Sequence, residues 1–455
     1  MSTRCLILFC LIQLSMSFAA IGQEQNATRT ASTGVSSFSP ERNTDLRAKI
    51  DKIYPALDAL YKHLHAHAEL SLHEEQTAAR LAKELREVGC EVTTGIGGHG
   101  VVGLLKNGAG PTVMVRADMD ALPITEKTGL SYASKVRTRD REGNEVGVMH
   151  ACGHDVNVTC LVGLGQVFAQ TKSQWRGTLM LIGQPAEEIG AGARAMLADR
   201  LFERFGRPDY AFALHCDAKF PHGTVNFREG LMQANVDSVD ILVQGKGAHG
   251  AAPHLAVDPI VLGCKIVLDL QTIVSREMNP IDPAVVTVGS FHAGTKHNII
   301  PNEAKLQITV RTTSSETRQR VLDSIARIAK GAAQTMRAPE PIIRVDPAHF
   351  TPALENNIAL TRKTVALFRQ VLGEEKVLPR PMSMGGEDFS QFVRAGIPGF
   401  YFHLGTADPK LWEEVRRGGP ALAGTHTDAY YPIPEPTIKT GVLSMSWAVL
   451  SILGR

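Results

Sequence analysis

Cys152 and His154 stand two positions apart in the segment MHACGHDVN, which spans residues 149 to 157. A thiolate and an imidazole at this spacing can reach one or two adjacent metal ions if further ligands converge from elsewhere in the chain. Taken singly, a cysteine is more often a buried inert thiol, and a histidine is more often a hydrogen-bonded structural side chain. The pair therefore predicts a metal site only if the sequence supplies partners for it.

Two adjacent carboxylates, Glu187 and Glu188, follow the apolar segment GTLMLIGQ at residues 177 to 184. Such a pair at the end of a buried strand is costly unless a cation or protons compensate its charge. One carboxylate can bind a metal ion while its neighbour takes a proton from an activated water and passes it to a leaving amine. The alternative for the pair is a solvated helix cap.

Three continuous apolar segments lie around these residues: TVMVRAD, GTLMLIGQ and YAFALHC. Because they do not alternate with polar residues, they predict strands buried on both faces, and hence a largely parallel sheet in an α/β domain. Polar side chains follow at their ends, namely Asp118 and Asp120, Glu187 and Glu188, and His215. The carboxyl ends of parallel strands meet at one edge of a sheet, where ligands bind, so we expect these groups to converge.

The order of apolar segments changes between residues 232 and 348 to strand, helix, strand, strand, helix, strand. This is the βαββαβ order of a ferredoxin-like unit, which is complete in itself. A helix near residues 357 to 371, the strand GFYFHLG and a closing helix from about residue 436 resume the first pattern. We therefore predict a catalytic domain formed by residues 44–231 and 349–455, interrupted by an inserted domain at 232–348.

Residues 1 to 20 carry one basic side chain, an apolar run and then small residues, which is typical of a signal peptide. We expect its cleavage and export of the protein to the periplasm or the cell exterior, or into the secretory pathway of a eukaryote, with no membrane span left. Residues 21 to 43 are predicted to be a disordered leader. A chain with 48 basic and 46 acidic residues gives no reason to expect a nucleic-acid partner.

Folding is expected to begin near Asp45, with two helices before Cys90. Ser71 and Glu74 have the spacing of a capping box, so we predict that they open the second helix. The five cysteines outside the predicted signal peptide stand singly in apolar surroundings. They predict mostly free thiols rather than a disulfide framework.

Seven segments occur in an order and spacing that resemble a known family: VRADMDALPITEKTGLSYAS, MHACGHD, GQPAEE, ALHCDAKFPHGTV, GKGAHGAAPH, GTKHNIIPNEA and SMGGEDFS. The family is that of the dinuclear metallopeptidases and amidohydrolases, which includes hippurate hydrolases, auxin-conjugate amidohydrolases, aminoacylases and carboxypeptidases. The chain resembles the subgroup with a cysteine ligand, over nearly all of residues 45 to 455. The resemblance implies a zinc-peptidase-like α/β fold, in which helices sandwich a mixed, mainly parallel sheet and the insert is a lid and dimerisation domain.

The resemblance also implies five metal ligands, which are Cys152, His154, Glu188, His215 and His426. These would hold two divalent ions. The thiolate favours zinc, although the ligand types also suit manganese, cobalt or nickel. Glu187 matches the general base, and Asp120 matches a carboxylate that orients a ligand.

In the inserted domain, the resemblance assigns substrate binding to His249, Asn298 and Arg311. An arginine suits a substrate carboxylate, and an imidazole donor suits the oxygen that becomes negative in a tetrahedral intermediate. Without the resemblance, each of the three would be interpreted as ordinary surface. One position departs from the family: Asn157 stands where a histidine is usual. Asparagine preserves a hydrogen-bonding role at this position but not a proton-transfer role.

The expected reaction is hydrolysis of the amide bond of a small N-acyl amino acid. A carboxypeptidase or dipeptidase that acts on short peptides is the alternative within the enzymes. A metal-binding envelope protein without activity is the alternative of another class, and Asn157 is the reason for it. The resemblance further implies a homodimer formed through the inserted domain.

Overall fold

The computed structural model describes residues 38 to 455, so the predicted signal peptide lies outside the described residues. The first helix, α1 (Pro40–Ala66), begins earlier than the expected Asp45. Ser39 accepts a hydrogen bond from the N–H of Arg42, and Pro40 occupies the first turn, where its missing N–H costs nothing. Residues 40 to 43 of the predicted leader are therefore helical.

The large sheet has eight strands in the order β1-β2-β6-β3-β7-β18-β8-β17. Strands β3, β6, β7 and β18 run parallel, whereas β1 and β2 are antiparallel additions at one edge and β8 is antiparallel to β18. This confirms the predicted mixed, mainly parallel sheet. The strands are β1 (Glu91–Ile96), β2 (Gly100–Asn107), β3 (Thr112–Asp118), β6 (Gly177–Gln184), β7 (Tyr210–Pro221), β8 (Val225–Phe227), β17 (Val377–Pro379) and β18 (Gly399–Ala407).

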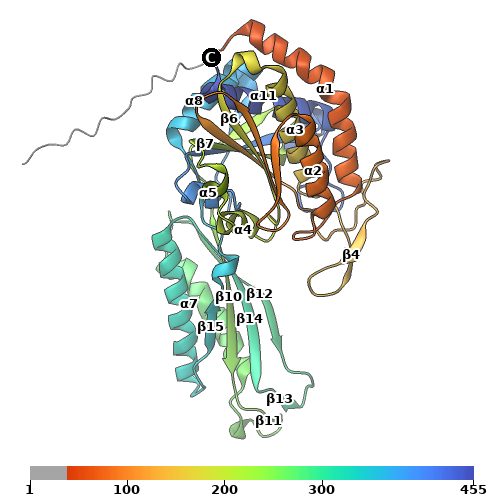
Figure 1. The fold of residues 1–455 in the computed structure, drawn as a ribbon. Coiled ribbons are helices and arrows are strands. Elements are labelled where there is room, and N and C mark those ends of the chain that lie inside the picture. The colour runs from red at the N-terminus through yellow and green to blue at the C-terminus, as the bar shows by residue number, and fades with distance from the viewer. Residues whose placement is uncertain (1–37) are drawn as a thin grey trace, which may run out of the picture. The chain divides into compact units, whose positions relative to one another are not determined.

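Helices cover both faces of this sheet, and β3 shows why (Figure 1). Val113 and Val115 belong to a buried cluster with the first group of helices, while Met114 between them packs on the other side with the second group. The first group is α1, α2 (Glu75–Glu87), α3 (His154–Gln170), α8 (Ile358–Leu372) and α11 (Pro434–Leu453). The second group is α4 (Gly192–Ala198), α5 (Leu201–Phe205) and α9 (Ser390–Arg394).

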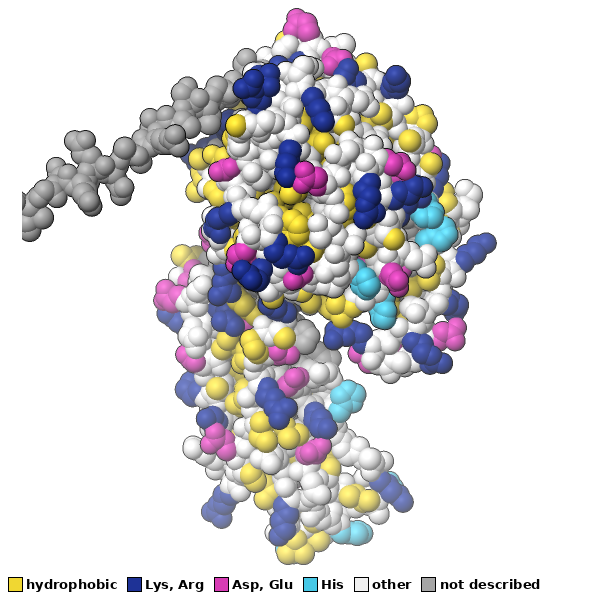
Figure 2. Space-filling model, in the orientation of Figure 1, with side chains coloured by type: hydrophobic (Ala, Val, Ile, Leu, Met, Phe, Trp, Pro, Cys, Tyr) yellow, Lys and Arg dark blue, Asp and Glu magenta, His cyan; other side chains and the backbone are white. Residues whose placement is uncertain are grey.

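Helix α11 is long and apolar enough to cross a membrane by length and composition, but 78% of its most apolar window is buried inside the protein. It is the one such helix among residues 38 to 455. Its side chains belong to the same core cluster as those of α1 and α3, so α11 is a core helix of the large domain. On the face shown in Figure 2, basic and acidic side chains are interspersed rather than gathered into a single patch.

The inserted segment forms a second, four-stranded antiparallel sheet in the order β12-β14-β10-β15. Two helices pack on it, and α7 lies along the sheet in Figure 1. The chain order and strand order are those of a ferredoxin-like unit, as predicted. Its elements are β10 (Asn235–Gln244), α6 (Pro259–Thr272), β12 (Ala284–Ala293), β14 (Glu303–Thr312), α7 (Ser315–Thr335) and β15 (Ile342–Val345).

Shorter elements lie outside these two sheets. Three small strand pairs are β4 (Arg137–Arg139) with β5 (Glu145–Gly147), β9 (Gly230–Gln233) with β16 (Leu354–Asn356), and β11 (Ala248–His249) with β13 (Ile299–Ile300). A further helix, α10 (Pro409–Arg416), follows β18. All five cysteines of the described chain are free thiols, as expected.

The predicted capping box at residues 71 to 74 is wrong. Helix α2 begins at Glu75, and its N-cap residue Glu74 makes no capping hydrogen bond with its side chain. Instead, Ser71 Oγ donates to Asp120 Oδ2 at 2.6 Å, and Glu74 Oε1 accepts from the N–H of Ala186 at 2.7 Å. Both side chains therefore bind segments that follow β3 and β6, because buried polar groups there compete with the helix N–H groups.

A buried histidine ties α1 to the start of α3. His65 Nδ1 lies 2.7 Å from Asp155 Oδ2, and its Nε2 lies 3.2 Å from Glu126 Oε1. Burial disfavours the charged ring, but the hydrogen bonds and charges of the two carboxylates outweigh it and raise the pKa of His65 to about 9. The folded protein therefore holds a proton here that the unfolded chain releases at lower pH.

We expect this proton to make stability depend on pH. Because the folded pKa is the higher one, the contribution is complete below about pH 6.5 and is lost as the pH rises through about 9. A shift of this size corresponds to ~3 kcal/mol. In urea unfolding, the difference in free energy of unfolding between wild type and His65→Gln should shrink by that amount between about pH 6 and about pH 10. His63→Gln, at an exposed position of the same helix, is the control. A difference that stays constant with pH would contradict the assignment.

Candidate metal centre

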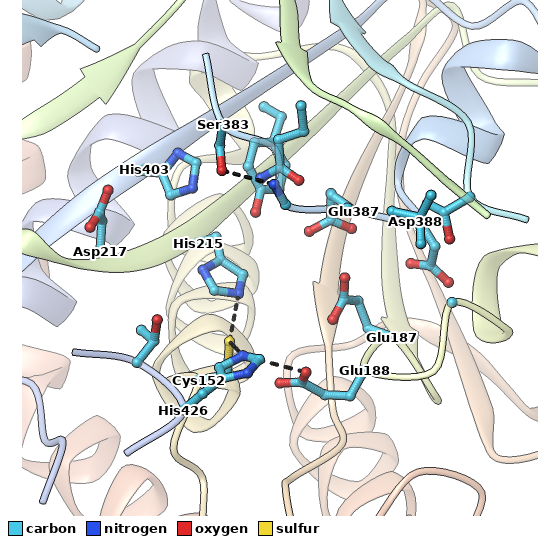
Figure 3. Close-up of a pocket in the computed structure, with 18 of the residues that line it drawn as sticks. Cys152, Glu187, Glu188, His215, Asp217, Ser383, Glu387, Asp388, His403 and His426 are labelled. Carbon is cyan, nitrogen blue, oxygen red and sulfur yellow. Dashed lines mark hydrogen bonds and ion pairs between the residues drawn. The ribbon is translucent and has the colours of Figure 1, made fainter. Parts of the chain in front are cut away.

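The thiol of Cys152 meets two imidazole rings in front of α3. Its Sγ lies 3.4 Å from His215 Nε2 and 3.2 Å from His426 Nε2. His215 Nε2 in turn lies 3.3 Å from His154 Nε2. Figure 3 shows Cys152, His215 and His426 directed toward one another. One sulfur and three ring nitrogens from three segments of the chain thus gather at one point.

Glu188 closes this group from the other side. Its Oε2 lies 3.5 Å from His426 Nε2, and its Oε1 lies 3.9 Å from His154 Nε2. Within the described chain, Oε1 is buried and has no hydrogen-bond partner. An orphaned carboxylate oxygen that faces imidazole nitrogens and a thiol fits a divalent cation.

Two sets of ligand atoms share Cys152, and the members of each set lie within 4.8 Å of one another. The first set is Cys152, His154 and His215, and the second is Cys152, Glu188 and His426. Two adjacent sets with nitrogen, sulfur and oxygen donors suit the predicted pair of ions.

Contacts behind the ligands fix how they point. His154 Nδ1 lies 2.7 Å from the carbonyl oxygen of Asp120, and His215 Nδ1 lies 2.8 Å from that of Cys216. Each ring is thereby left with its Nε2 free for a cation. Asp120 Oδ2 also accepts from the N–H of Glu188 at 3.0 Å. Asp120 therefore touches two of the ligand residues, which is the arrangement that its predicted orienting role requires.

The side chains of this site bind protons that compensate the negative charge of its carboxylates. Burial, together with Glu188 and Glu187, raises the pKa of the Cys152 thiol well above its usual range. Burial opposes the charged form of His154, yet Asp118, Asp120 and Glu188 raise its pKa to about 10. Protons thus balance the carboxylates, and a divalent cation would displace them from the thiol and the ring.

Glu187 shares no set with Cys152, but it forms one set with His154 and Glu188 and a carboxylate cluster with Glu387 and Asp388. Burial, Glu387 and Glu188 raise the pKa of Glu187 well above its usual value. Figure 3 shows Glu187 and Glu188 on the same side of the site. A carboxylate with a raised pKa beside a cation site is suited to take up and return a proton.

A buried arginine holds this carboxylate cluster, and the sequence analysis missed it. Arg116 is fully buried, and its Nη1 donates to Asp118 Oδ2 at 2.7 Å. Its Nη2 donates to Glu387 Oε1 and Asp388 Oδ1, both at 2.8 Å. The available signal was a cation inside the apolar segment TVMVRAD, where burial is affordable only if acidic partners are present.

Asn157 completes the support of Asp118. Its Nδ2 donates to Asp118 Oδ1 at 2.7 Å, and both side chains are buried. The neutral amide donates to the carboxylate without transferring a proton, so the structure favours the hydrogen-bonding role for this position.

Glu74 supports the peptide that presents Glu187. Ala186 has φ +52°, a left-handed conformation that costs ~1 kcal/mol or more in a residue other than glycine. Its N–H donates to Glu74 Oε1 at 2.7 Å, and its carbonyl accepts from the N–H groups of Ala191 and Gly192 at 3.0 and 3.1 Å. Hydrogen bonds to both its N–H and its carbonyl therefore hold Ala186 in this conformation.

Removing the carboxylate of Glu74 should misplace Glu187. We expect Glu74→Ala to lower kcat about 10- to 100-fold, because a shift of about 1 Å at a catalytic group has this effect. Glu74→Gln keeps the acceptor Oε1 and should retain most of the activity. Steady-state kinetics at equal metal content would measure both variants, with Glu75→Gln at the neighbouring exposed position as the control. Equal activity of Glu74→Ala and wild type would show that Ala186 holds its conformation unaided.

Four of the five predicted metal ligands, Cys152, Glu188, His215 and His426, line a cavity of about 580 Å³. Arg311 of β14 lines the same cavity, as do Glu187 and Glu188. His249 and Asn298 are neighbours at the β11–β13 strand pair, where the N–H of Gly250 donates to the carbonyl of Asn298 at 2.8 Å. Neither is among the described residues that line the cavity. Their part in substrate binding stays a prediction, and within one chain the structure does not bring them to the ligands.

Residues 114–417 match the model of peptidase family M20/M25/M40. A hippurate hydrolase of Campylobacter jejuni is 38% identical over 355 residues, which are 76% of this chain and 86% of that protein. Thermostable carboxypeptidase 1 of Saccharolobus solfataricus is 34% identical over 369 residues, 80% of this chain and 89% of that protein. A solved Bacillus subtilis structure, described as a dinuclear metal binding peptidase from the M20 family, superposes with a TM-score of 0.70 and 30% identity over 89% of this chain and all of that chain.

Proposed function

This chain belongs to peptidase family M20/M25/M40, and on this premise we propose that it hydrolyses the amide bond of N-acyl amino acids with the help of two divalent metal ions. The observation that carries the proposal is the gathering of Cys152, His154, Glu188, His215 and His426 around one point, with Glu187 beside them. The name of the Campylobacter jejuni relative, a hippurate hydrolase, supports this class of substrate.

The five gathered side chains would hold the ions. Bound there, the ions would supply Lewis acidity, which polarises the substrate carbonyl and lowers the pKa of a water molecule so that it can lose a proton and attack the carbonyl. Glu187 accepts the proton of the attacking water and returns it to the leaving nitrogen, so that the amine departs neutral. Arg116 keeps Glu387 and Asp388 in place beside Glu187, and Arg311 offers its guanidinium to the substrate carboxylate.

Hydrolysis of true peptides is the second candidate, and the carboxypeptidase of Saccharolobus solfataricus is the relative that favours it. A substrate panel separates the two. We expect release of a free amino acid, detected with ninhydrin, from N-acetyl and N-benzoyl amino acids, and slower release from dipeptides and from longer peptides. Faster release from peptides would establish the second candidate instead.

The same panel tests the proposal of catalysis itself. Each assay would be run with added zinc, manganese or cobalt, since the ligand set suits all three and the thiolate favours zinc. Bound metal without turnover of any acyl amino acid or peptide would support the inactive metal-binding protein considered from the sequence.

We also propose a dimer formed through the inserted domain, and export directed by residues 1 to 20. Exposed apolar side chains on and beside α6 support the dimer, namely Leu255, Val261, Leu268 and Val274. The pattern of one basic side chain, an apolar run and small residues supports export. Analytical ultracentrifugation tests the first proposal. Sequencing the N-terminus of protein recovered from the exported fraction tests the second.

A further inference from the structure

Arg380 lies in the wall of the cavity and is short of hydrogen-bond partners. Its side chain is only 10% exposed. Its Nη1 lies 3.2 Å from Asp217 Oδ2, but the two atoms are not aligned for a hydrogen bond, and both are buried without a partner in the part of the chain that the structure describes. A guanidinium offers five N–H donors, so most of the capacity of this side chain is unused.

Two further polar groups line the same wall. Asp217 follows His215 on β7, and its Oδ1 accepts from the N–H of Lys219 at 2.9 Å. His403 of β18 stands directly opposite His215 in the strand register, and its Nδ1 is buried without a described partner. Figure 3 shows His403 and Asp217 on the side of His215 that is away from Glu187 and Glu188. We call Asp217, Arg380 and His403 the Arg380 wall.

A buried cation with a single misaligned partner is costly to keep, unless a ligand completes its hydrogen bonds. The planar fork of arginine matches a carboxylate with two parallel N–H···O bonds. Asp217 neutralises only one cation, whereas Arg141, Lys219 and Arg311 also line the cavity. Outside the metal ligands and the Glu387–Asp388 cluster, the cavity therefore has an excess of positive charge.

Few aliphatic side chains line the cavity. Its branched aliphatic side chains are Ile189 and Val236, and its one phenol ring is that of Tyr401. Arg311 comes from β14 of the inserted domain, and Arg380 comes from the segment after β17 of the large sheet. Arg311 and Arg380 thus reach the cavity from separate elements, in addition to Arg141.

We propose that the Arg380 wall binds a second carboxylate of the substrate, in addition to the α-carboxylate assigned to Arg311. The preferred substrate is then an N-acyl amino acid with two carboxylates. The second carboxylate comes either from an acidic amino acid or from a dicarboxylic acyl group. This inference rests on the proposed function and narrows its substrate class.

The test compares kcat/KM for four substrates of the metal-loaded enzyme: N-acetyl-L-alanine, N-acetyl-L-glutamate, N-succinyl-L-alanine and N-benzoylglycine. We expect one of the two dicarboxylates to exceed N-acetyl-L-alanine by about 10- to 100-fold, the size of effect that a charge-assisted bidentate contact produces. The better of the two identifies the source of the second carboxylate. Equal values for N-acetyl-L-alanine and both dicarboxylates would overturn the inference.

Variants connect the preference to Arg380. In Arg380→Gln, the ratio of kcat/KM for the preferred dicarboxylate to that for N-acetyl-L-alanine should fall toward one, and Arg380→Lys should give an intermediate ratio because it keeps the charge without the fork. Arg311→Gln should lower kcat/KM for all substrates and leave the ratio as it is. Lys376→Gln, an exposed cation of the preceding turn, is the matched control and should leave the ratio of the wild type.

Metal content and thermal unfolding establish that each variant is folded. If folded Arg380→Gln keeps the preference of the wild type, or loses all substrates by the same factor, the second carboxylate is not bound by Arg380 and the inference is overturned. A wild-type enzyme that hydrolyses no member of the panel would overturn the proposed function itself. That outcome is distinct from hydrolysis of N-acetyl-L-alanine without a preference.

Discussion

Replacing Glu187 by glutamine is expected to lower kcat about 10³-fold. The amide keeps the size of the side chain but cannot accept the proton of the attacking water. Glu187 is not one of the five predicted ligands and shares no ligand set with Cys152, so we expect the Glu187→Gln variant still to bind two ions. KM should change little, since Glu187 acts on the water and the leaving nitrogen rather than on substrate binding.

The matched variant for this prediction is Glu188→Gln, one position along the chain. Glu188 faces His154 and His426, so its loss should lower metal content as well as activity. Elemental analysis and kinetics on both variants separate the two roles. If Glu187→Gln loses metal as Glu188→Gln does, Glu187 is a ligand and the general base must be sought elsewhere.

Patterns that are local in the chain predicted the fold well. The continuous apolar segments around Val115, Leu181 and Phe212 became β3, β6 and β7, because a strand buried on both faces must be apolar throughout. The βαββαβ order of the insert was also visible in the sequence, since apolar residues repeat with one period in helices and another in strands. Both predictions depend on neighbours in sequence, which propensity and burial determine.

Contacts between distant segments were the part that the sequence could not supply. Ser71 and Glu74 have the spacing of a capping box, yet their side chains reach Asp120 and Ala186, far along the chain. The local capping rule predicts that these side chains bind the N–H groups of the helix. In the folded chain, they bind buried polar groups of distant segments instead.

Arg116 and Arg380 illustrate the same limit. The partners of Arg116 at positions 387 and 388 are 271 and 272 residues away. A basic residue within a strand does not reveal which acidic residues it pairs with. Arg380 stands in a polar loop segment and would be interpreted from sequence as solvated. Only the structure shows that it is buried beside Asp217.

Removal of the metal ions is the second change with a large expected effect. After treatment with a chelator and its removal, we expect hydrolysis of N-acyl amino acids to fall at least about 10³-fold, because Lewis acidity and the acidified water are lost together. Zinc, manganese or cobalt should restore it. Thermal unfolding should occur at a lower temperature in the metal-free protein, since a bound ion stabilises the folded state by mass action.

Proton release distinguishes binding at this site from binding elsewhere. Without a cation, burial and carboxylates keep the Cys152 thiol protonated, and His154 carries a positive charge with a pKa of about 10. Both must lose a proton to become ligands, so metal binding near pH 7 should release protons. Calorimetric titration in two buffers of different ionisation enthalpy measures their number. Cys152→Ser should release fewer protons, since serine binds a cation without first giving up a thiol proton. Binding of two ions with no proton released would mean that the ions lie outside the group formed by Cys152, His154 and Glu188, and the metal centre assigned to this cavity would be wrong.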